Sequence, residues 1–479
     1  MNNLDTANLG RSKIRQVSIT EVVNQKKIEK ILLENISLFE NFLKKENDKS
    51  GQEVFDYLKK NKKLNFSINK QIELFIINNR KNIIKIIKYI IFRYKFLKCG
   101  RDKVNFGYPL YLLIEPVSAC NLRCPFCFQI DKSFTRKPYM GVMNFKLFKK
   151  IVDEANKIGV GAITIASRGE PTLHKQFIEM VEHLGKQENI FEIKINTNGT
   201  FLSEKICHSI FKNKVSQLVI SADHYIKKDY ERLRLNSNFE KVVKNVDRLF
   251  NIRKKYYPNS FTEIRISGID NEKNLDRNKF KEFWIQRSDH VTASYPLERW
   301  NTYKNEIHPS IKDPCENLWD RMYIWFDGKV NPCDADYKSY LSYGDYNNKS
   351  ITEIWNDKII KKLTTDKRWD DQVSFVKKDH NVKPSWFGLS MLINKKFKQS
   401  KKLILNRLDK LGIENRPIIS GNFLKQPALR KYNIRQKSKD FPNANYVHEY
   451  GLHVGLENKI MSRIEIEKFV NIFFKSFDF

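Results

Sequence analysis

The chain has 479 residues, of which 41% are hydrophobic and 13% aromatic, a composition that argues against a disordered chain and suits a folded protein of two or three domains. Lysine and arginine outnumber aspartate and glutamate by 87 to 55, and the formal net charge of +32 favours anionic partners. The basic residues are spread along almost every segment, as on a solvated surface, so the charge alone does not favour nucleic acid as the partner.

Seven cysteines in a chain of this length do not suggest a disulfide framework, and no charged-then-apolar signal segment opens the sequence. We therefore expect a cytoplasmic, reducing location, where closely spaced cysteines indicate metal binding or catalysis. The longest apolar stretch, Asn82 to Leu97, is interrupted by lysines and an arginine, so it is too charged and too short to span a bilayer. We expect it to be an amphipathic helix packed on the protein's own core, with peripheral membrane contact as the alternative.

Residues 1–105 predict a basic region of helices separated by short polar breaks. After residue 105, short apolar runs alternate with helical patterns, which predicts an α/β fold with a parallel sheet, such as an incomplete TIM-type barrel. The expected strands lie within residues 108–117, 160–167, 191–197, 215–223 and 262–269. In such folds the chemistry lies at the carboxyl ends of the strands, so the loops that follow these runs are the candidate site.

Three cysteines, Cys120, Cys124 and Cys127, directly follow the first apolar run. A structural zinc site needs four ligands, and the next downstream candidate, His174, is distant in sequence. An iron–sulfur cluster held by three thiolates keeps one iron open for a substrate or cofactor. The spacing therefore favours a cluster over zinc.

The C-x3-C-x2-C spacing, with Phe126 before the third cysteine, resembles the signature of the radical SAM superfamily. The resemblance implies a [4Fe–4S] cluster on these cysteines, S-adenosylmethionine (SAM) on the open iron, and Phe126 beside the cofactor. It also implies that an electron from a donor such as flavodoxin or ferredoxin cleaves the sulfonium, and that the resulting 5′-deoxyadenosyl radical removes hydrogen from a substrate.

The loops after the second and third runs fit the same resemblance. Gly169 and Glu170 match the family's Gly-Glu motif, which implies contact with the methionyl amino group, although Arg168 stands where the family more often has glycine. Asn198 and Gly199 match a polar turn beside the cofactor, and an Asn-Gly pair is in itself only a turn signal.

After the fourth run, Ser221 and Arg234 match a Ser-x-Asp segment and a Tyr-Glu-x-x-Arg helix. The resemblance implies that Ser221 contacts the ribose or methionine part of SAM. It implies that Arg234, with its planar guanidinium, pairs with the methionine carboxylate.

Residues 306–375 resemble the first part of a SPASM or twitch extension, which binds auxiliary iron–sulfur clusters and here contains Cys315 and Cys333. No cysteine follows Cys333, so a full set of auxiliary ligands is missing. Either other groups such as Asp334 and Asp336 complete a site, or the module has kept its fold and lost its metal. The pattern favours loss.

Residues 380–479 resemble the C-terminal part of DegT/DnrJ/EryC1/StrS sugar aminotransferases, in particular the 3-dehydratase branch. The matching blocks are Ser385–Gly388, Arg416–Pro417, Gly421–Asn422 and Gln426–Pro427. The pyridoxal phosphate domain of those enzymes is not in this chain, so neither that cofactor nor transamination is expected. The resemblance implies a small α/β module that either docks a partner or faces a sugar nucleotide, with Arg416 as a substrate contact.

We therefore expect four domains: residues 1–105, a radical SAM core over 106–305, the extension over 306–375, and the C-terminal module over 380–479. The expected function is hydrogen abstraction from a small molecule, a nucleotide sugar of surface polysaccharide synthesis, ending in epimerisation, dehydrogenation or elimination. A peptide-modifying maturase, an RNA-modifying enzyme and a non-catalytic binding module remain as alternatives. No catalytic residue beyond the cofactor contacts is identified from the sequence.

Overall fold

The structure, a computed structural model of the chain, describes residues 23–102, 104–166, 168–270, 275–294, 302, 316–356, 373–375, 388–394, 401–417, 425, 438–455 and 463–477. The chain divides into two compact units. The first comprises Met1–Asn305 and Cys315–Trp355, and the second comprises Glu306–Pro314 and Asn356–Phe479. Each unit is described by itself.

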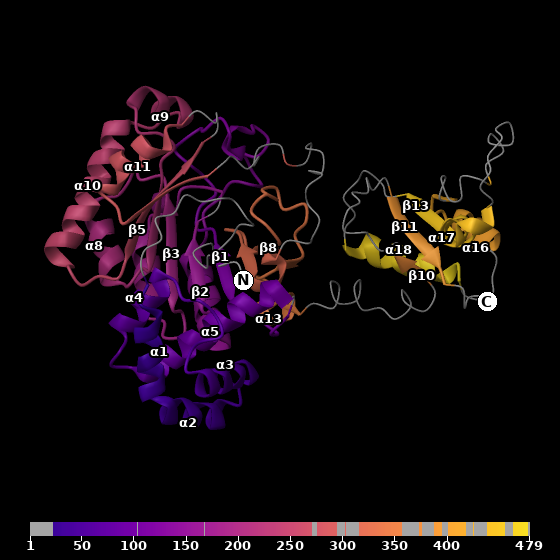
Figure 1. The fold of residues 1–479 in the computed structure, drawn as a ribbon. Helices are drawn as coiled ribbons and strands as arrows, with labels where there is room; N and C mark the ends of the chain where they lie inside the picture. The colour runs from indigo at the N-terminus through magenta and orange to yellow at the C-terminus, as the bar shows by residue number, and fades with distance from the viewer. Residues whose placement is uncertain are drawn as a thin grey trace. The chain divides into compact units, whose positions relative to one another are not determined.

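The first unit begins with a bundle of helices, as the sequence predicts (Figure 1). They are α1 (Gln25–Glu34), α2 (Ile36–Glu46), α3 (Lys49–Asn61), α4 (Lys70–Asn78) and α5 (Ile83–Asp102). Asn24, Asp48 and Asn69 each accept a backbone N–H at the start of a helix, which satisfies one of the donors left free there. In the part of the chain that the structure describes, no helix combines the length and the apolar character needed to cross a membrane.

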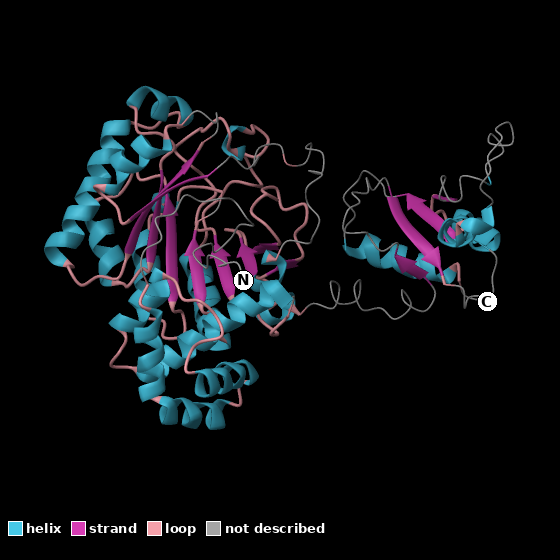
Figure 2. Cartoon of the chain, viewed as in Figure 1, coloured by secondary structure: helices cyan, strands magenta, loops and turns pink. Residues whose placement is uncertain are grey.

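The core of the first unit is a sheet, whose strands are magenta in Figure 2. Among the described residues, its nine strands run in the order β6-β5-β4-β3-β2-β1-β7-β8-β9. Neighbouring strands from β6 to β7 are parallel, and β8 and β9 are added antiparallel. The strands are β1 (Tyr111–Ile114), β2 (Ala162–Ile165), β3 (Glu192–Thr197), β4 (Gln217–Ser221), β5 (Glu263–Ile269), β6 (His290–Ser294), β7 (Arg321–Ile324), β8 (Lys329–Asn331) and β9 (Gly344–Asp345). This is the α/β fold with a partial TIM-type barrel that the sequence predicts.

Helices connect the parallel strands and cover the outer face of the sheet. They are α6 (Phe145–Ile158), α7 (Phe177–Gly185), α8 (Glu204–Lys212), α9 (Lys227–Leu233), α10 (Phe239–Tyr256) and α11 (Arg277–Ile285), with the short turns η1 (Phe128–Ile130) and η2 (Pro171–Leu173). Two further helices, α12 (Asn317–Asp320) and α13 (Ile351–Trp355), flank the last three strands. The apolar faces of α6 to α11 and of α13, together with one face of the sheet, form a single buried cluster.

Successive side chains along each strand point to opposite faces of the sheet. Ile193 and Ile195 of β3 belong to the core shared with the outer helices, as do Ile264 and Ile266 of β5. Residues between them, such as Lys194 and Arg265, therefore face the inner side. This inner face carries polar side chains that a strand buried on both sides would lack.

The N-terminal helices close the amino-terminal end of the inner face. Tyr111, Leu113 and Ala162 from the first strands pack in one cluster with residues of α1 to α5. On α5, Arg93 forms a buried ion pair of 3.0 Å with Glu192 at the start of β3, and the Tyr89 hydroxyl donates to the same carboxylate over 2.6 Å. The stretch expected to be an amphipathic helix thus packs on the protein's own core.

The second unit is a four-stranded antiparallel sheet in the order β10-β11-β13-β12. Its elements are β10 (Val373–Phe375), β11 (Gly388–Ile393), α16 (Lys401–Lys410), β12 (Asn415–Pro417), η5 (Ser438–Asp440), α17 (Pro442–Tyr450), β13 (Gly451–Gly455) and α18 (Arg463–Lys475). Met391, Leu452 and Phe473 belong to its own core, so this unit has an independent apolar interior.

Candidate active site

The loop between β1 and η1 holds the three cysteines at the carboxyl end of the sheet. Its backbone is fixed locally, because the Cys127 N–H donates to the Cys124 carbonyl over 3.0 Å. Cys124 is buried, and Cys120 and Cys127 are partly buried. The thiols lie close enough for the charge on each of the other two to affect Cys127.

Burial raises the pKa of Cys120 to about 11 and that of Cys127 to about 12, and it also raises the pKa of Cys124. The positive charge of Arg234 acts in the opposite direction on all three thiols. Because thiolates are the ligands of iron, filling the site must release protons.

Gly169 lies directly against the cysteine loop. A Cβ at this position would come within 2.3 Å of the Ala119 carbonyl oxygen and 2.4 Å of the Val117 carbonyl oxygen. The next residue, Glu170, donates its backbone N–H to the same Ala119 carbonyl over 2.9 Å. In this structure the glycine is therefore required for the loop after β2 to approach the cysteine loop.

The substitution Gly169→Ala should displace the cysteine loop and lower iron retention after anaerobic reconstitution by about half or more. The methyl group would meet backbone atoms, which cannot rotate away as a side chain can. Iron and sulfide per chain measure the effect. Lys205→Ala, which truncates an exposed side chain of α8, is the control and should leave the iron content unchanged. Equal iron in Gly169→Ala and wild type would contradict this reading of the contact.

Glu170 links the loops that follow β2 and β3. Its Oε1 accepts from the hydroxyls of Thr172 and Thr197 over 2.6 and 2.7 Å, and its Oε2 accepts from the Asn198 N–H over 2.7 Å. Asn198 in turn donates from Nδ2 to the Asn121 Oδ1 over 2.9 Å, and this Nδ2 lies 3.8 Å from the Cys120 Sγ. The predicted cofactor contacts Glu170 and Asn198 thus support the cysteine loop directly.

Arg234 reaches the cysteines from the end of α9. The loop after this helix is tied to the cysteine loop, since the Arg123 N–H donates to the Leu235 carbonyl over 3.0 Å. Arg234 is 6% exposed, and its Nε pairs with the Asp223 Oδ2 at 2.8 Å. Burial lowers the pKa of Arg234, but the charges of Asp223 and Cys124 outweigh it, so the net shift is upward. Among the described residues, its two terminal nitrogens have no hydrogen-bond acceptor.

Ser221 ends β4 at the same edge of the sheet, and Phe126 lies in the cysteine loop, both partly exposed. The Ser221 hydroxyl forms no hydrogen bond with a described residue. The structure therefore brings together at one edge every residue that the sequence predicted for the cluster and for SAM.

The donors fit an iron–sulfur cluster better than a zinc ion. No three His, Cys, Asp or Glu side chains converge on one metal position in the described ranges. Each thiolate of a cubane binds a different iron, so such a site does not need three sulfurs at one point. His174 is not available as a fourth ligand, because its Nε2 contacts the Met143 carbonyl at 2.9 Å and its Nδ1 accepts from the Gln176 N–H at 3.0 Å. The terminal nitrogens of Arg234 beside the thiols suit the carboxylate of SAM.

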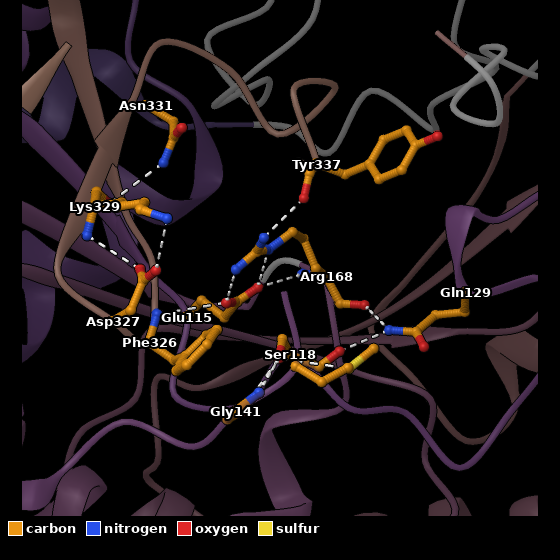
Figure 3. A network of polar contacts seen from close by, with 11 residues as sticks. Glu115, Ser118, Gln129, Gly141, Arg168, Phe326, Asp327, Lys329, Asn331 and Tyr337 are labelled. Carbon is orange, nitrogen blue, oxygen red and sulfur yellow. Dashed lines mark hydrogen bonds and ion pairs between the residues drawn. The ribbon is translucent and has the colours of Figure 1, made fainter. Parts of the chain in front are cut away.

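Arg168, the departure from the family pattern, joins the site to the extension (Figure 3). Its guanidinium pairs with the fully buried Glu115 at the end of β1 through Nε, at 2.6 Å, and through Nη2. Its Nη1 donates to the Tyr337 carbonyl over 2.7 Å, and its carbon Cζ lies 4.6 Å from the centre of the Trp325 ring. Gln129, two residues after the last cysteine, donates from Nε2 to the carbonyls of Ser118 and Arg168 (Figure 3).

Sequence reasoning missed Gln129 and the role of Arg168. A charged residue in place of a glycine, directly after a buried strand, was the available signal, since such a side chain must find a partner. Its contacts with Trp325 and Tyr337 could not be identified without knowing that β7 pairs beside β1.

The proposed auxiliary site is described only in part. Cys333 lies after β8, its Sγ is 3.7 Å from the Asp334 Oδ1, and it accepts from the Ala335 N–H at 3.4 Å. Cys315 lies outside the described residues, so loss of an auxiliary cluster stays a prediction.

The sugar-aminotransferase resemblance also stays a prediction. Arg416 lies in β12, where it pairs in register with His453 of β13, and its side chain is not among those described. Ser385–Phe387, Gly421–Asn422 and Gln426–Pro427 lie outside the described residues.

Comparison with known families matches two segments of the chain, one in the expected core and one in the expected extension. Residues 114–283 match the radical SAM superfamily, and residues 315–376 match the SPASM domain, described as an iron–sulfur cluster-binding domain. This chain carries a radical SAM domain followed by a SPASM domain. The match supports the [4Fe–4S] cluster and SAM that the sequence predicts as the cofactors of this domain.

This chain is similar in sequence to curated proteins over part of their length. The cofactor-modifying protein of tungsten-containing aldehyde ferredoxin oxidoreductase from Pyrococcus furiosus is 35% identical over 24% of this chain and 30% of its own. A GTP 3′,8-cyclase from Thermodesulfovibrio yellowstonii is 26% identical over 49% of this chain and 73% of its own. The chain thus spans less than a third of the Pyrococcus protein.

Among solved structures, Streptococcus suis SuiB bound to precursor peptide SuiA aligns with 71% of this chain and 83% of its own. The TM-score is 0.45 and the identity is 17%.

Proposed function

We propose that this radical SAM chain cleaves SAM reductively and removes a hydrogen atom from a nucleotide-activated sugar, leading to epimerisation, dehydrogenation or elimination. One observation carries the first half of this proposal. The loops after β2, β3 and α9 each form a hydrogen bond with the cysteine loop, through Glu170, Asn198 and Leu235.

The proposal gives each described residue a task. Cys120, Cys124 and Cys127 would bind three irons, and the terminal nitrogens of Arg234 would hold the SAM carboxylate. The hydroxyl of Ser221 would contact the ribose or methionine part. When bound, the cluster and SAM supply the one-electron cleavage that starts hydrogen abstraction.

Glu170 and Asn198 would position the site. Glu170 accepts hydrogen bonds from Thr172, Thr197 and Asn198 and so holds together the loops after β2 and β3. Its carboxylate would offer SAM only the acceptor sites that these bonds leave. Gly169 would keep the cysteine loop and the loop after β2 in contact.

The substrate half of the proposal rests on charge and resemblance. The net charge of +32 suits a phosphorylated substrate, and the C-terminal segment resembles sugar-nucleotide enzymes. The curated relatives include enzymes named GTP 3′,8-cyclase, which act on a nucleotide by that name. A flavodoxin or ferredoxin would supply the electron, and Arg416 would be a substrate contact of the second unit.

The test is anaerobic reconstitution of the full chain, followed by iron and sulfide counting and an assay for 5′-deoxyadenosine with dithionite as reductant. About four irons per chain and formation of 5′-deoxyadenosine are expected. A folded protein that neither binds iron nor cleaves SAM would be a non-catalytic binding module. Substantially more iron would indicate an auxiliary cluster.

The substrate is tested by adding nucleotide sugars that carry deuterium on their ring carbons and following the transfer of deuterium to 5′-deoxyadenosine. Faster SAM cleavage with a nucleotide sugar than with the free sugar is expected. Stimulation by a peptide instead would favour a peptide maturase.

A further inference from the structure

A row of polar side chains runs down the inner face of β3, away from the cysteines. Lys194 and Asn196 occupy positions between the isoleucines that face the outer core, and both are partly exposed. Asn198, which follows the strand, contacts Cys120 at the upper end of this row. At about 3.3 Å per residue, Lys194 lies roughly 13 Å along the strand from Asn198.

The side-chain nitrogen of Lys194 has no counter-ion in contact with it among the residues that the structure describes. None of them forms a hydrogen bond or ion pair with its ammonium group. The two carboxylates whose charge acts on it are engaged elsewhere: Glu192 with Arg93 and Tyr89, and Glu263 with Gln217 and His290.

Two arginines of the same face increase the positive charge around Lys194. Arg265 of β5 donates to the Thr292 hydroxyl, and Arg321 at the start of β7 forms a bidentate pair with Asp320. Burial lowers the pKa of Lys194 to about 7, with further lowering by Arg265 and Arg321 and opposite contributions from Glu263 and Glu192. A bound anion would offset the free-energy cost of burying this positive charge beside two others.

Asn196 provides a second, independent indication of a ligand. Its Oδ1 is buried and has no hydrogen-bond partner within the described ranges. Buried polar atoms without a partner are uncommon, because leaving one unsatisfied costs about 1–3 kcal/mol. A donor on a ligand, such as a hydroxyl or amine, would satisfy it.

We propose that Lys194 and Asn196 form a substrate subsite in which Lys194 binds a phosphate group and Asn196 accepts a hydrogen bond from a neighbouring hydroxyl or amine. This proposal rests on the proposed function, because the subsite lies below the cysteine loop on the same inner face. It describes an extended substrate whose phosphate is remote from the atom that loses hydrogen. Tyr89 and Arg93 of α5 hold Glu192 at the amino-terminal end of this face, so the substrate would enter from the cysteine side.

The test is calorimetric titration of the full chain with inorganic pyrophosphate at physiological salt, for wild type, Lys194→Met, Lys194→Arg and Asn196→Ala. Lys194→Met should weaken binding at least tenfold, and Lys194→Arg should retain it. Lys205→Met removes an exposed lysine of α8 and is the matched control, with unchanged affinity expected. Methionine is close to lysine in volume, and circular dichroism of each variant checks the fold.

The pH dependence adds a readout that non-specific attraction to a basic protein would not give. Phosphate binding needs the protonated lysine, so wild-type affinity should be highest below the pKa of about 7 and fall about tenfold per pH unit above it. The groups facing Lys194 that also bear on this profile are Glu192, Glu263, Arg265 and Arg321. Lys194→Arg should show a flatter profile up to pH 9, since arginine stays charged.

The outcomes separate this inference from the proposed function. Loss of pyrophosphate binding in Lys194→Met, in a protein that fails to cleave SAM, would support the subsite and reject the proposed chemistry. If wild type does not bind pyrophosphate, or if Lys194→Met binds it as wild type does, the subsite is wrong even when SAM is cleaved.

Discussion

Replacing Cys124 by alanine should leave a folded protein that retains less than half of the wild-type iron and forms 5′-deoxyadenosine only at background level. Two thiolates remain, and a cubane held by two protein ligands is exposed to loss of iron. The fold should survive, because the contacts that hold the loop are backbone hydrogen bonds and bonds from Asn121 and Gln129 rather than from the Cys124 sulfur.

Iron, sulfide and 5′-deoxyadenosine per chain measure this effect after anaerobic reconstitution. Cys207→Ala is the matched control, because Cys207 is a fully buried thiol of α8 in the outer core. Wild-type iron content and cleavage in Cys124→Ala would show that the triad is not the cluster site.

The substitution Arg168→Met should lower the free energy of unfolding of the first unit by about 3–5 kcal/mol, because it leaves the buried Glu115 carboxylate without its cation. Of the protein donors to Glu115, the backbone N–H groups of Arg168 and Phe326 would remain, at 3.2 and 3.4 Å. The Tyr337 carbonyl would also lose its donor, so amide exchange should increase in residues 333–343.

Urea unfolding followed by tryptophan fluorescence measures this effect, since Trp325 stacks on the guanidinium. The double variant Glu115→Gln with Arg168→Met should recover part of the loss, because no buried charge is left unpaired. Lys227→Met, which breaks an exposed pair with Glu240, is the control and should leave the curve unchanged. An unchanged curve for Arg168→Met would mean that Glu115 finds another partner.

Much of this arrangement could be predicted from the sequence. The apolar runs identified β1 to β5 because strands covered by helices must be apolar, and parallel pairing places their carboxyl ends at one edge. That rule is sufficient to bring Cys120, Glu170 and Ser221 to one edge, whereas Arg234, at the end of α9, was predicted only from the family resemblance.

The inner face was harder to predict. The run from Phe191 to Thr197 was interpreted as one buried strand, yet Lys194 and Asn196 alternate with isoleucines in it. Period-two alternation was present as a signal for a polar inner face. The contacts of Arg168 with Trp325 and Tyr337 could not be predicted, because they depend on pairing between segments more than 150 residues apart in sequence, which local patterns do not encode.

The pairing of β7 with β1 has a consequence for dissecting the protein. A SPASM segment joined by a linker could be removed with little effect, but here Tyr111–Ile114 is bonded strand to strand with Arg321–Ile324. A chain cut before residue 316 would leave the backbone groups of β1 unpaired along an apolar edge, which invites association between molecules. The expected product is aggregated protein, and a shortened chain that keeps the catalytic core should therefore extend at least through Trp355.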